Sequence, residues 1–235
     1  MTLSLFIAAI IDGLILSGVY ALAALGFVII YRATGVFNFA QGEFMMLGAY
    51  VFFLFSTTYE LPFFVTSALV LASVALVGAG VYFLLVRPLT GQPLLAVIII
   101  TMGVAILMRA LTGLFWGTTN LYFMAPLMTT FIDLGGYYTL SAYDLASIVV
   151  CLLTYGAIMA FLRFSPIGLQ MQATAENPTL ASQRGVNLNL VFALSWTIAA
   201  LSASVAGAVF AGRTAVSLNI SHLGLSAFPA AIVGG

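Results

Sequence analysis

Three charged residues lie inside otherwise apolar stretches of this chain: Asp12, Glu43 and Arg109. A charge at the centre of a bilayer costs about 2.5–3.5 kcal/mol on insertion scales, so charges in apolar segments are candidates for a functional role. Arg109 lies near the end of its stretch, and we favour a structural role in which its aliphatic stem covers apolar surface while the guanidinium reaches outward to water. Asp12 fits equally well as a buried, hydrogen-bonded group and as an interfacial one.

Glu43 differs from the other two because it belongs to a polar cluster with Asn38 and Gln41. Gly42 would give access to the backbone there, and Gly35 would supply a turn. A helix that begins inside a membrane leaves backbone N–H groups free to meet a ligand carboxylate. The same acidic residue near a helix N-terminus is also a plain cap that complements the helix dipole. Composition alone slightly favours the role of Glu43 as a helix cap. The cluster Asn38, Gln41, Gly42 and Glu43 is nevertheless our candidate for the substrate pathway.

Several kinds of chemistry are excluded by residues that the sequence lacks. It contains no lysine, so it carries neither a Walker A phosphate-binding loop nor a Schiff-base lysine. Its one cysteine, Cys151, and one histidine, His222, are too few for zinc, haem or iron–sulfur ligation, so we expect no cofactor and no metal. The net charge of zero predicts no binding to nucleic acid. Energy for any transport would come from an ion gradient or from a separate ATPase subunit.

The elements that position these residues are predicted to be membrane helices. Hydrophobic residues make up 63% of the chain and charged residues only 5%, against about a quarter charged in soluble domains. An apolar stretch of roughly 18 or more residues is long enough to span a bilayer. Five such helices are predicted: Leu3–Tyr31, Phe63–Val86, Leu94–Phe115, Leu145–Leu162 and Leu188–Gly212. The fold class is therefore an all-α, polytopic transmembrane helix bundle in one domain over residues 1–235.

Two further segments fit a simple span poorly. Val36–Ser56 begins with the polar cluster, and only Phe44–Thr57 is apolar. We therefore predict a short or discontinuous membrane segment near residues 36–56, either a span with a polar end or a short helix entered by a re-entrant turn. Thr214–Gly235 is apolar but is interrupted by Pro229 and glycines, which predicts another discontinuous element or an unfinished span.

Arginine positions predict the orientation of the bundle. The loops that contain Arg87, Arg163 and Arg184 are interpreted as cytoplasmic, and the aromatic loop Trp116–Tyr143 as extracytoplasmic. If Val36–Ser56 spans the membrane, the N-terminus lies outside; if that segment is re-entrant, the N-terminus changes side.

Small residues recur at four-residue spacing in the last predicted span, at Ala199, Ala203, Gly207 and Ala211. Small residues on one helix face let two backbones approach closely, which is the main packing contact in lipid. We expect this face to pack against other helices of the same subunit.

The cytoplasmic connection, residues 163–188, has the signals of two capped helices. Ser165-Pro166 reads as an N-cap followed by proline at the first helical position, and Asn177-Pro178 repeats the device. The second, short helix is expected to stop at Gly185. Two capped helices indicate a docking surface, whereas an ordinary amphipathic connector would lie on the membrane with Leu169 and Met171 in the headgroups.

Four stretches resemble motifs of the branched-chain amino-acid ABC transporter permeases. They are Gly18–Gly26, Gly35–Tyr50, Gly168–Val191 and Ala227–Gly235, and together they cover nearly the whole chain in order. The chain departs from the family in having Gln41 where members usually have histidine. Members also usually continue for several tens of residues beyond the final Gly-Gly, which predicts a C-terminally incomplete permease with an exposed apolar groove where further helices would pack.

The resemblance implies a permease subunit of a binding-protein-dependent importer in the cell (inner) membrane, embedded in the lipid bilayer. Its expected partners are a second permease subunit, cytoplasmic ABC ATPase subunits and a soluble substrate-binding protein. Glu176, Asn177, Pro178, Arg184 and Gly185 would then form the ATPase-coupling surface. Branched-chain amino acids are the expected cargo, with urea or short amides as the alternative.

Two alternatives from other classes remain open at this point. A secondary transporter or channel without an ATPase would use buried ionisable groups for ion coupling, and only Asp12, Glu43 and Arg109 are available. A membrane enzyme would need a nucleophile–base pair or a metal cluster, and the sequence has neither pattern. We therefore expect a transport subunit and not an enzyme.

Overall fold

The structure is a computed structural model that describes residues 3–89, 92–123, 127–133 and 139–234. The predicted outer loop Trp116–Tyr143 is therefore only partly described, and Gly235 lies outside the described residues. The long helices are α1 (Leu3–Thr34), α3 (Phe63–Val81), α4 (Leu94–Trp116), α5 (Ala142–Phe164) and α8 (Leu188–Arg213). The short helices are α2 (Gln41–Phe53), α6 (Pro166–Glu176), α7 (Pro178–Gln183), α9 (Ile220–Ser226) and α10 (Phe228–Gly234).

Within the described residues, five helices are long and apolar enough to cross a membrane, and they match the five predicted spans. The second of them extends α3 through a π-helical turn (Tyr82–Val86) and a 3₁₀ turn (Arg87–Leu89). Two of these helices begin directly after a proline. Pro62 precedes α3 and Pro93 precedes α4, and each proline has an extended backbone conformation. The prediction of an all-α polytopic bundle is confirmed.

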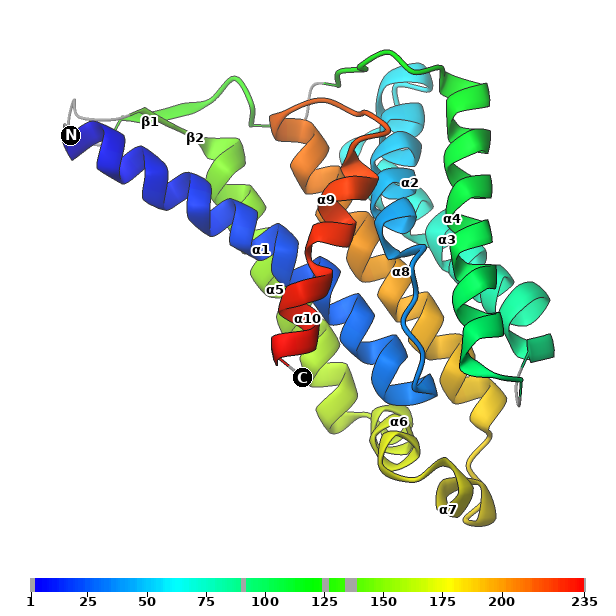
Figure 1. The fold of residues 1–235 in the computed structure, drawn as a ribbon. Coiled ribbons are helices and arrows are strands. Elements are labelled where there is room, and N and C mark those ends of the chain that lie inside the picture. The colour runs from blue at the N-terminus through cyan, green and yellow to red at the C-terminus, as the bar shows by residue number, and fades with distance from the viewer. Residues whose placement is uncertain (1–2, 90–91, 124–126, 134–138, 235) are drawn as a thin grey trace.

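A small β-hairpin is the one regular element that the sequence did not predict. Strands β1 (Phe131–Asp133) and β2 (Thr139–Ser141) pair antiparallel, with Phe131 opposite Ser141. The hairpin lies at the end of the bundle where α1 begins and α5 starts (Figure 1). Ser141 also caps α5, since its hydroxyl accepts a hydrogen bond from the Tyr143 N–H at 3.2 Å.

Helix α8 is the centre of the bundle, and its small residues make close contacts with three other helices (Figure 1). A Cβ added to Gly207 would lie 1.8 Å from the Met45 carbonyl oxygen of α2. A Cβ added to Gly78 of α3 would lie 2.8 Å from Ala200 of α8. The predicted packing of the small-residue face within the subunit is therefore confirmed, and backbones meet where side chains are smallest.

The segment before α2 runs back into the bundle as extended chain (Figure 1). After α1 ends, Gly35 turns the chain with a φ of +71°, and residues 36–40 lead to α2 without helical structure. A π-helical turn, Leu54–Thr58, continues α2 toward the opposite end. The segment therefore runs from one end of the bundle to the other, as the first predicted alternative expects, with Asn38 in its extended part and Gln41 and Glu43 in the first turn of α2.

The C-terminal elements α9 and α10 form the second discontinuous element. They return from the hairpin end into the bundle beside α2 and α1, with a break at Ala227 between them (Figure 1). This agrees with the prediction of a discontinuous element over Thr214–Gly235.

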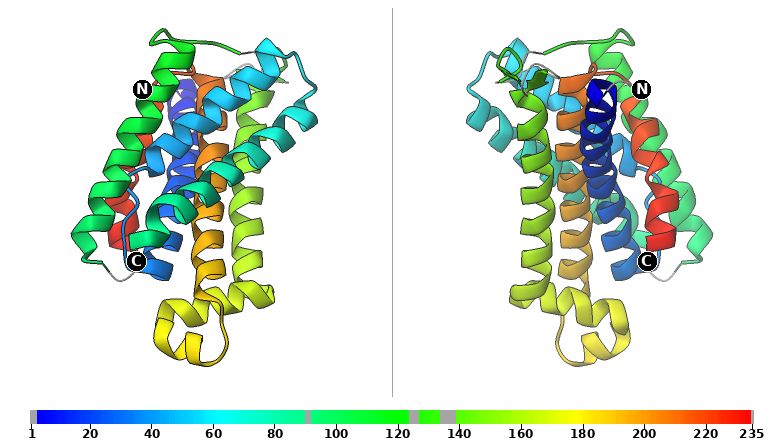
Figure 2. Two further views of the ribbon diagram at one scale, coloured as in Figure 1. Left: turned by 90° about the vertical axis from the view of Figure 1, so that its right-hand side faces the viewer. Right: turned by 90° about the vertical axis from the view of Figure 1, so that its left-hand side faces the viewer.

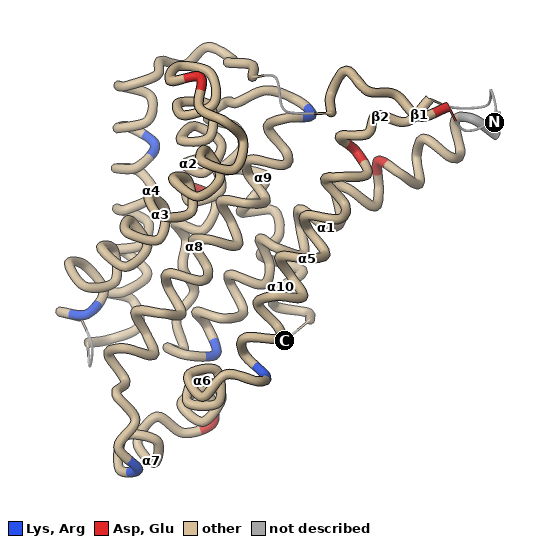
Figure 3. The backbone as a smooth tube through the Cα atoms, turned by 180° about the vertical axis from the view of Figure 1, so that it is seen from behind, with Lys and Arg blue, Asp and Glu red and all other residues tan. Residues whose placement is uncertain are grey.

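The two ends of the bundle differ in charge (Figure 3). Helices α6 and α7 project from one end (Figure 2), and the arginines there are Arg32, Arg87, Arg163 and Arg184. The N-terminus lies at the other end, close to the hairpin (Figure 1). An excess of arginine is typical of the cytoplasmic side, so the α6–α7 end remains predicted as cytoplasmic and the N-terminal end as extracytoplasmic.

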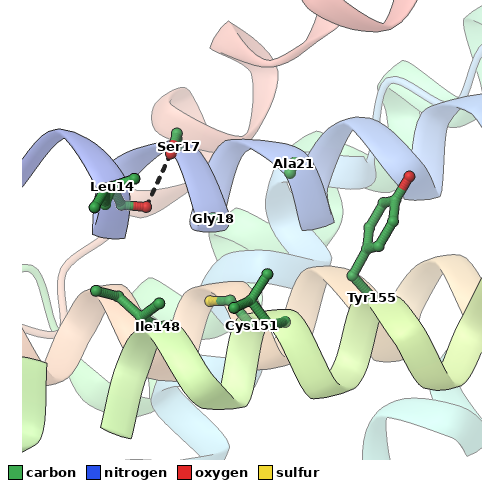
Figure 4. A pocket seen from close by; sticks show the side chains of 8 residues that line it. Leu14, Ser17, Gly18, Ala21, Ile148, Cys151 and Tyr155 are labelled. Carbon is green, nitrogen blue, oxygen red and sulfur yellow. Dashed lines mark hydrogen bonds between the residues drawn. The ribbon is translucent and has the colours of Figure 1, made fainter. Parts of the chain in front are cut away.

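An apolar groove follows the contact between α1 and α5 (Figure 4). It has a volume of about 400 Å³, and Cys151 of α5 points across it toward Gly18 of α1. A Cβ at Gly18 would lie 3.1 Å from the Cys151 Cβ, which explains the close approach of the two helices at this point. A second cavity of about 740 Å³ shares Ala21 and Tyr155 with the groove and extends toward α6 and α10.

Candidate functional site

Aromatic contacts hold the extended segment that leads to α2 and carries Asn38. Phe37 stacks on Tyr31 of α1 with ring centroids 4.3 Å apart, and its ring meets the edge of Phe228 of α10 at 4.9 Å. Phe228 also contacts Phe27 and Phe39. The segment is therefore fixed between the C-terminal half of α1 and the last described helix.

Asn38 organises the start of α2. Its Oδ1 accepts a hydrogen bond from the Ala40 N–H at 2.9 Å, and its carbonyl accepts one from the Gln41 N–H at 3.2 Å. The neighbouring Phe39 N–H donates to Thr101 of α4 at 3.4 Å. The Asn38 side chain is fully buried, yet its Nδ2 has no hydrogen-bond partner among the described residues.

Gln41 joins α2 to α8. Its Nε2 donates to the Ala199 carbonyl at 3.1 Å, while its Oε1 is buried without a partner in the described chain. Gly26 of α1 makes room for this side chain, because a Cβ there would lie 1.9 Å from Gln41 Nε2. Gly26, which ends the motif Gly18–Gly26, is therefore required by Gln41 of the motif Gly35–Tyr50.

Glu43 lies in the first turn of α2 with only 4% of its surface exposed. An acidic side chain at this position complements the helix dipole, as the interpretation of Glu43 as a cap expects. Its Oε2 has no partner within the described residues. Ser221 of α9 and Arg109 of α4 are the polar neighbours of the carboxyl group.

Gly42 brings α2 against α9 at backbone distance. A Cβ added to Gly42 would lie 2.1 Å from the Ser221 carbonyl oxygen, and one added to Gly224 would lie 2.6 Å from the Gly42 Cα. The predicted role of Gly42 in exposing backbone to a ligand is not tested, because α9 covers it in this conformation.

Arg109 is half-buried, and its guanidinium contacts the segment around α9. Its Nη2 donates to the Leu218 carbonyl at 3.1 Å and lies 2.8 Å from His222 Nε2. Both partners belong to the α9 region, which lies beside α2. The helix face that carries Arg109 therefore looks into the protein, and periodicity alone could not show this because α4 is apolar on all sides.

Asp12 takes part in an ionic cluster at the hairpin end of the bundle. Arg213 at the end of α8 pairs with Asp12 of α1 at 2.7 Å and with Asp144 of α5 at 2.8 Å. The Asp12 side chain is 55% exposed and that of Asp144 only 12%. The structure therefore supports the interfacial interpretation of Asp12. Arg213 and Asp144 were not among our predicted functional residues. Their opposite charges at the same-side ends of two predicted spans could have indicated this ion pair.

The connection over residues 163–188 folds as two capped helices, as predicted. The Ser165 hydroxyl accepts from the Gly168 N–H at 2.8 Å, and Asn177 Oδ1 accepts from the Leu180 N–H at 3.0 Å. Gly185 ends the α7 turn with a φ of +88°. Met171 is buried against Ile29 of α1, so it does not lie in the headgroups, whereas Leu169 is exposed.

The predicted coupling residues form an exposed group on α7 and its two ends. Their side chains or backbone lie on the surface at Glu176, Asn177, Pro178, Arg184 and Gly185. No group of three His, Cys, Asp or Glu side chains in the described part of the chain is arranged to hold a metal ion.

Replacing Gly26 by alanine is expected to break the Gln41–Ala199 hydrogen bond. The new Cβ would occupy the position of Gln41 Nε2, and a buried amide N–H left without its acceptor costs about 1–3 kcal/mol. Thermal unfolding of the purified protein in detergent should show a lower midpoint than the wild type. Gly13→Ala on the same helix is the matched control, since a Cβ there meets nothing within 4 Å.

A double-variant cycle tests the cause. In a Gln41→Ala background the obstacle is gone, so Gly26→Ala should lower the midpoint much less than it does in the wild type. Equal effects in both backgrounds would show that Gly26 does not act through Gln41.

Comparison with known proteins gives one consistent result. The family described as "Branched-chain amino acid transport system / permease component" matches residues 9–235. The LivH high-affinity branched-chain amino acid transport system permease protein of Salmonella typhimurium is 29% identical over 98% of this chain and 79% of that protein. LivH of Escherichia coli K12 is 30% identical over 98% and 79%, and BraD of Pseudomonas aeruginosa is 28% identical over the same shares. No solved structure matches the chain.

The family match covers both discontinuous elements and the α6–α7 connection, the same regions in which the motifs lie. With five membrane-crossing helices in its described residues, the molecule is a membrane protein and a transport subunit. The chain belongs to the permease component family of branched-chain amino acid transport systems.

Proposed function

We propose that this chain is a permease subunit of a binding-protein-dependent ABC importer that carries branched-chain amino acids across the cell membrane. A second permease subunit would complete the pathway, cytoplasmic ATPase subunits would supply the energy, and a soluble binding protein would deliver the substrate. The relatives bear names of branched-chain amino acid permeases, which supports this choice of cargo.

The observation that carries the proposal is the start of α2 inside the bundle. Asn38, Gln41 and Glu43 each bury one polar side-chain atom without a hydrogen-bond partner in the described residues. Water cannot satisfy such atoms in the lipid core, where each unsatisfied polar group costs several kcal/mol. Their retention at one short segment supports a role in the pathway of a polar substrate, with Gly42 as part of the same segment.

Coupling to the ATPase is proposed to run through α7. Its cap at Asn177, the proline at position 178 and the stop at Gly185 make it a defined surface feature at the arginine-rich end. Glu176 and Arg184 are exposed at its two ends and offer opposite charges to a partner. A mechanical link needs such defined structure, because a flexible loop would absorb the motion of the ATPase.

Reconstitution tests the proposal. The subunit would be assembled in proteoliposomes with its second permease, ATPases and binding protein, and uptake of labelled leucine and labelled urea would be compared. We expect ATP-dependent uptake of leucine and none of urea. Uptake of urea alone, or uptake of leucine that needs an ion gradient in place of ATP, would contradict the proposal.

A further inference from the structure

The buried acid of α2 faces α9 and α4, away from the Gln41 side. Glu43 is 4% exposed, and its Oε2 is an acceptor with no hydrogen donor in the described part of the molecule. A carboxylate in a membrane protein that lacks a donor on one oxygen is an expensive arrangement unless a ligand completes it. Ser221 of α9 and Arg109 of α4 are its polar neighbours.

Arg109 supplies the opposite charge from α4. Its Nη2 contacts the Leu218 carbonyl and His222, whereas its Nη1 and Nε make no hydrogen bond to the described residues. A guanidinium presents five N–H donors in a planar fork that matches a carboxylate. Two contacts to α9 thus fix the orientation of the fork while most of its donors stay available.

The acid and the guanidinium do not pair with each other. Of the described residues, only Arg213, Asp12 and Asp144 form ion pairs, and they lie at the hairpin end. Both groups lie beside the same stretch of the chain, because Gly42 meets the Ser221 carbonyl and Arg109 contacts Leu218 and His222. Two opposite charges beside one stretch, but not paired, match a molecule that carries an ammonium and a carboxylate on the same carbon atom.

We propose that Glu43 and Arg109 are the two poles of a site for the zwitterionic head of an amino acid, with the ammonium on Glu43 and the carboxylate on Arg109. This inference rests on the proposed function and names the groups by which the permease itself recognises its cargo. Met45 and Leu225, which lie at the same α2–α9 contact, provide apolar surface for an aliphatic side chain.

Access to the site requires α9 to move away from α2. The two helices meet at Gly42 and Gly224, where their backbones touch and the side chains of Leu225 and Met45 pack beside the glycines. Helix α9 has only seven residues and follows a non-helical connection from α8. Opening this contact would expose Glu43, and closing it gives the occluded arrangement seen here.

Ligand analogues that lack one charge provide the test. Binding of leucine, 4-methylpentanoate (no ammonium) and 3-methylbutylamine (no carboxylate) would be measured by saturation-transfer NMR on the assembled permease–ATPase complex, with and without ATP. Glu43→Gln should weaken leucine roughly tenfold or more, the effect of losing a charge-assisted hydrogen bond, but should leave 4-methylpentanoate unchanged. Arg109→Gln should weaken leucine similarly and leave 3-methylbutylamine unchanged.

Glu60→Gln and Arg87→Gln are the matched controls, since both residues are exposed outside the site, and each should bind leucine as the wild type does. If Glu43→Gln fails to assemble, Glu43→Asp keeps the charge and should still prefer leucine to 4-methylpentanoate. Unchanged leucine binding in both site variants, equal losses for all three ligands, or no leucine signal in the wild type would overturn the site. The proposed function survives those outcomes if the complete wild-type complex takes up leucine, and it fails separately if that uptake is absent.

Discussion

Gly207→Ala is expected to destabilise the helix bundle strongly, because one added methyl group has nowhere to go. The new Cβ would lie 1.8 Å from the Met45 carbonyl oxygen and 2.7 Å from its carbonyl carbon. Both are backbone atoms of α2, so no side-chain rotation can relieve the overlap, and α2 and α8 must separate. Overpacking costs about 1–3 kcal/mol and occasionally more, and a backbone clash belongs at the upper end.

Fluorescence of Trp196, which is fully buried on the same helix, can report the thermal unfolding of the variant in detergent. Gly103→Ala on α4 is the control, since a Cβ there meets nothing within 4 Å. Alanine has a helix propensity about 1 kcal/mol better than glycine, so the control should be neutral or slightly stabilising. If both variants unfolded at the same temperature, the close α2–α8 contact would not be a determinant of stability.

The positions of the membrane helices follow from local sequence. The span predicted over Leu94–Phe115 is observed as Leu94–Trp116, because length and hydropathy decide whether a segment crosses and prolines or charges mark its ends. The caps of α6 and α7 were likewise predictable, since a capping side chain bonds to a backbone N–H only a few residues away.

The candidate site could be predicted only in part. The polar residues around the start of α2 are close together in the sequence, so they could be recognised as a cluster. In the structure their side chains are buried. The position of Arg109 beside α9 could not be predicted, because α4 is apolar all round and no periodicity distinguishes its inner face. The close contacts of Gly26 and Gly224 could not be predicted either. Their partners are distant in sequence, and only the fold shows which helices are neighbours.

The double variant Asn177→Ala, Pro178→Gly is expected to separate ATP hydrolysis from substrate uptake. Helix α7 has only six residues, and its one buried residue is Ala181, so packing contributes little to its stability. Isolated helices this short do not form in water, so its caps must hold it. Loss of the Asn177 cap costs about 1 kcal/mol and exchange of proline for glycine about 0.4–1 kcal/mol more, together roughly a tenfold smaller folded population.

In proteoliposomes with the ATPases and binding protein, the double variant should retain ATP hydrolysis while leucine uptake falls by about the same factor of ten. Asn187→Ala is the matched control, because Asn187 caps α8 through the same type of bond, to the Leu190 N–H at 3.3 Å. Helix α8 has 26 residues and is buried at the centre of the bundle, so losing its cap should leave uptake close to the wild-type level. If the double variant kept both hydrolysis and uptake, or if Asn187→Ala lost uptake equally, α7 would not be the element that transmits force.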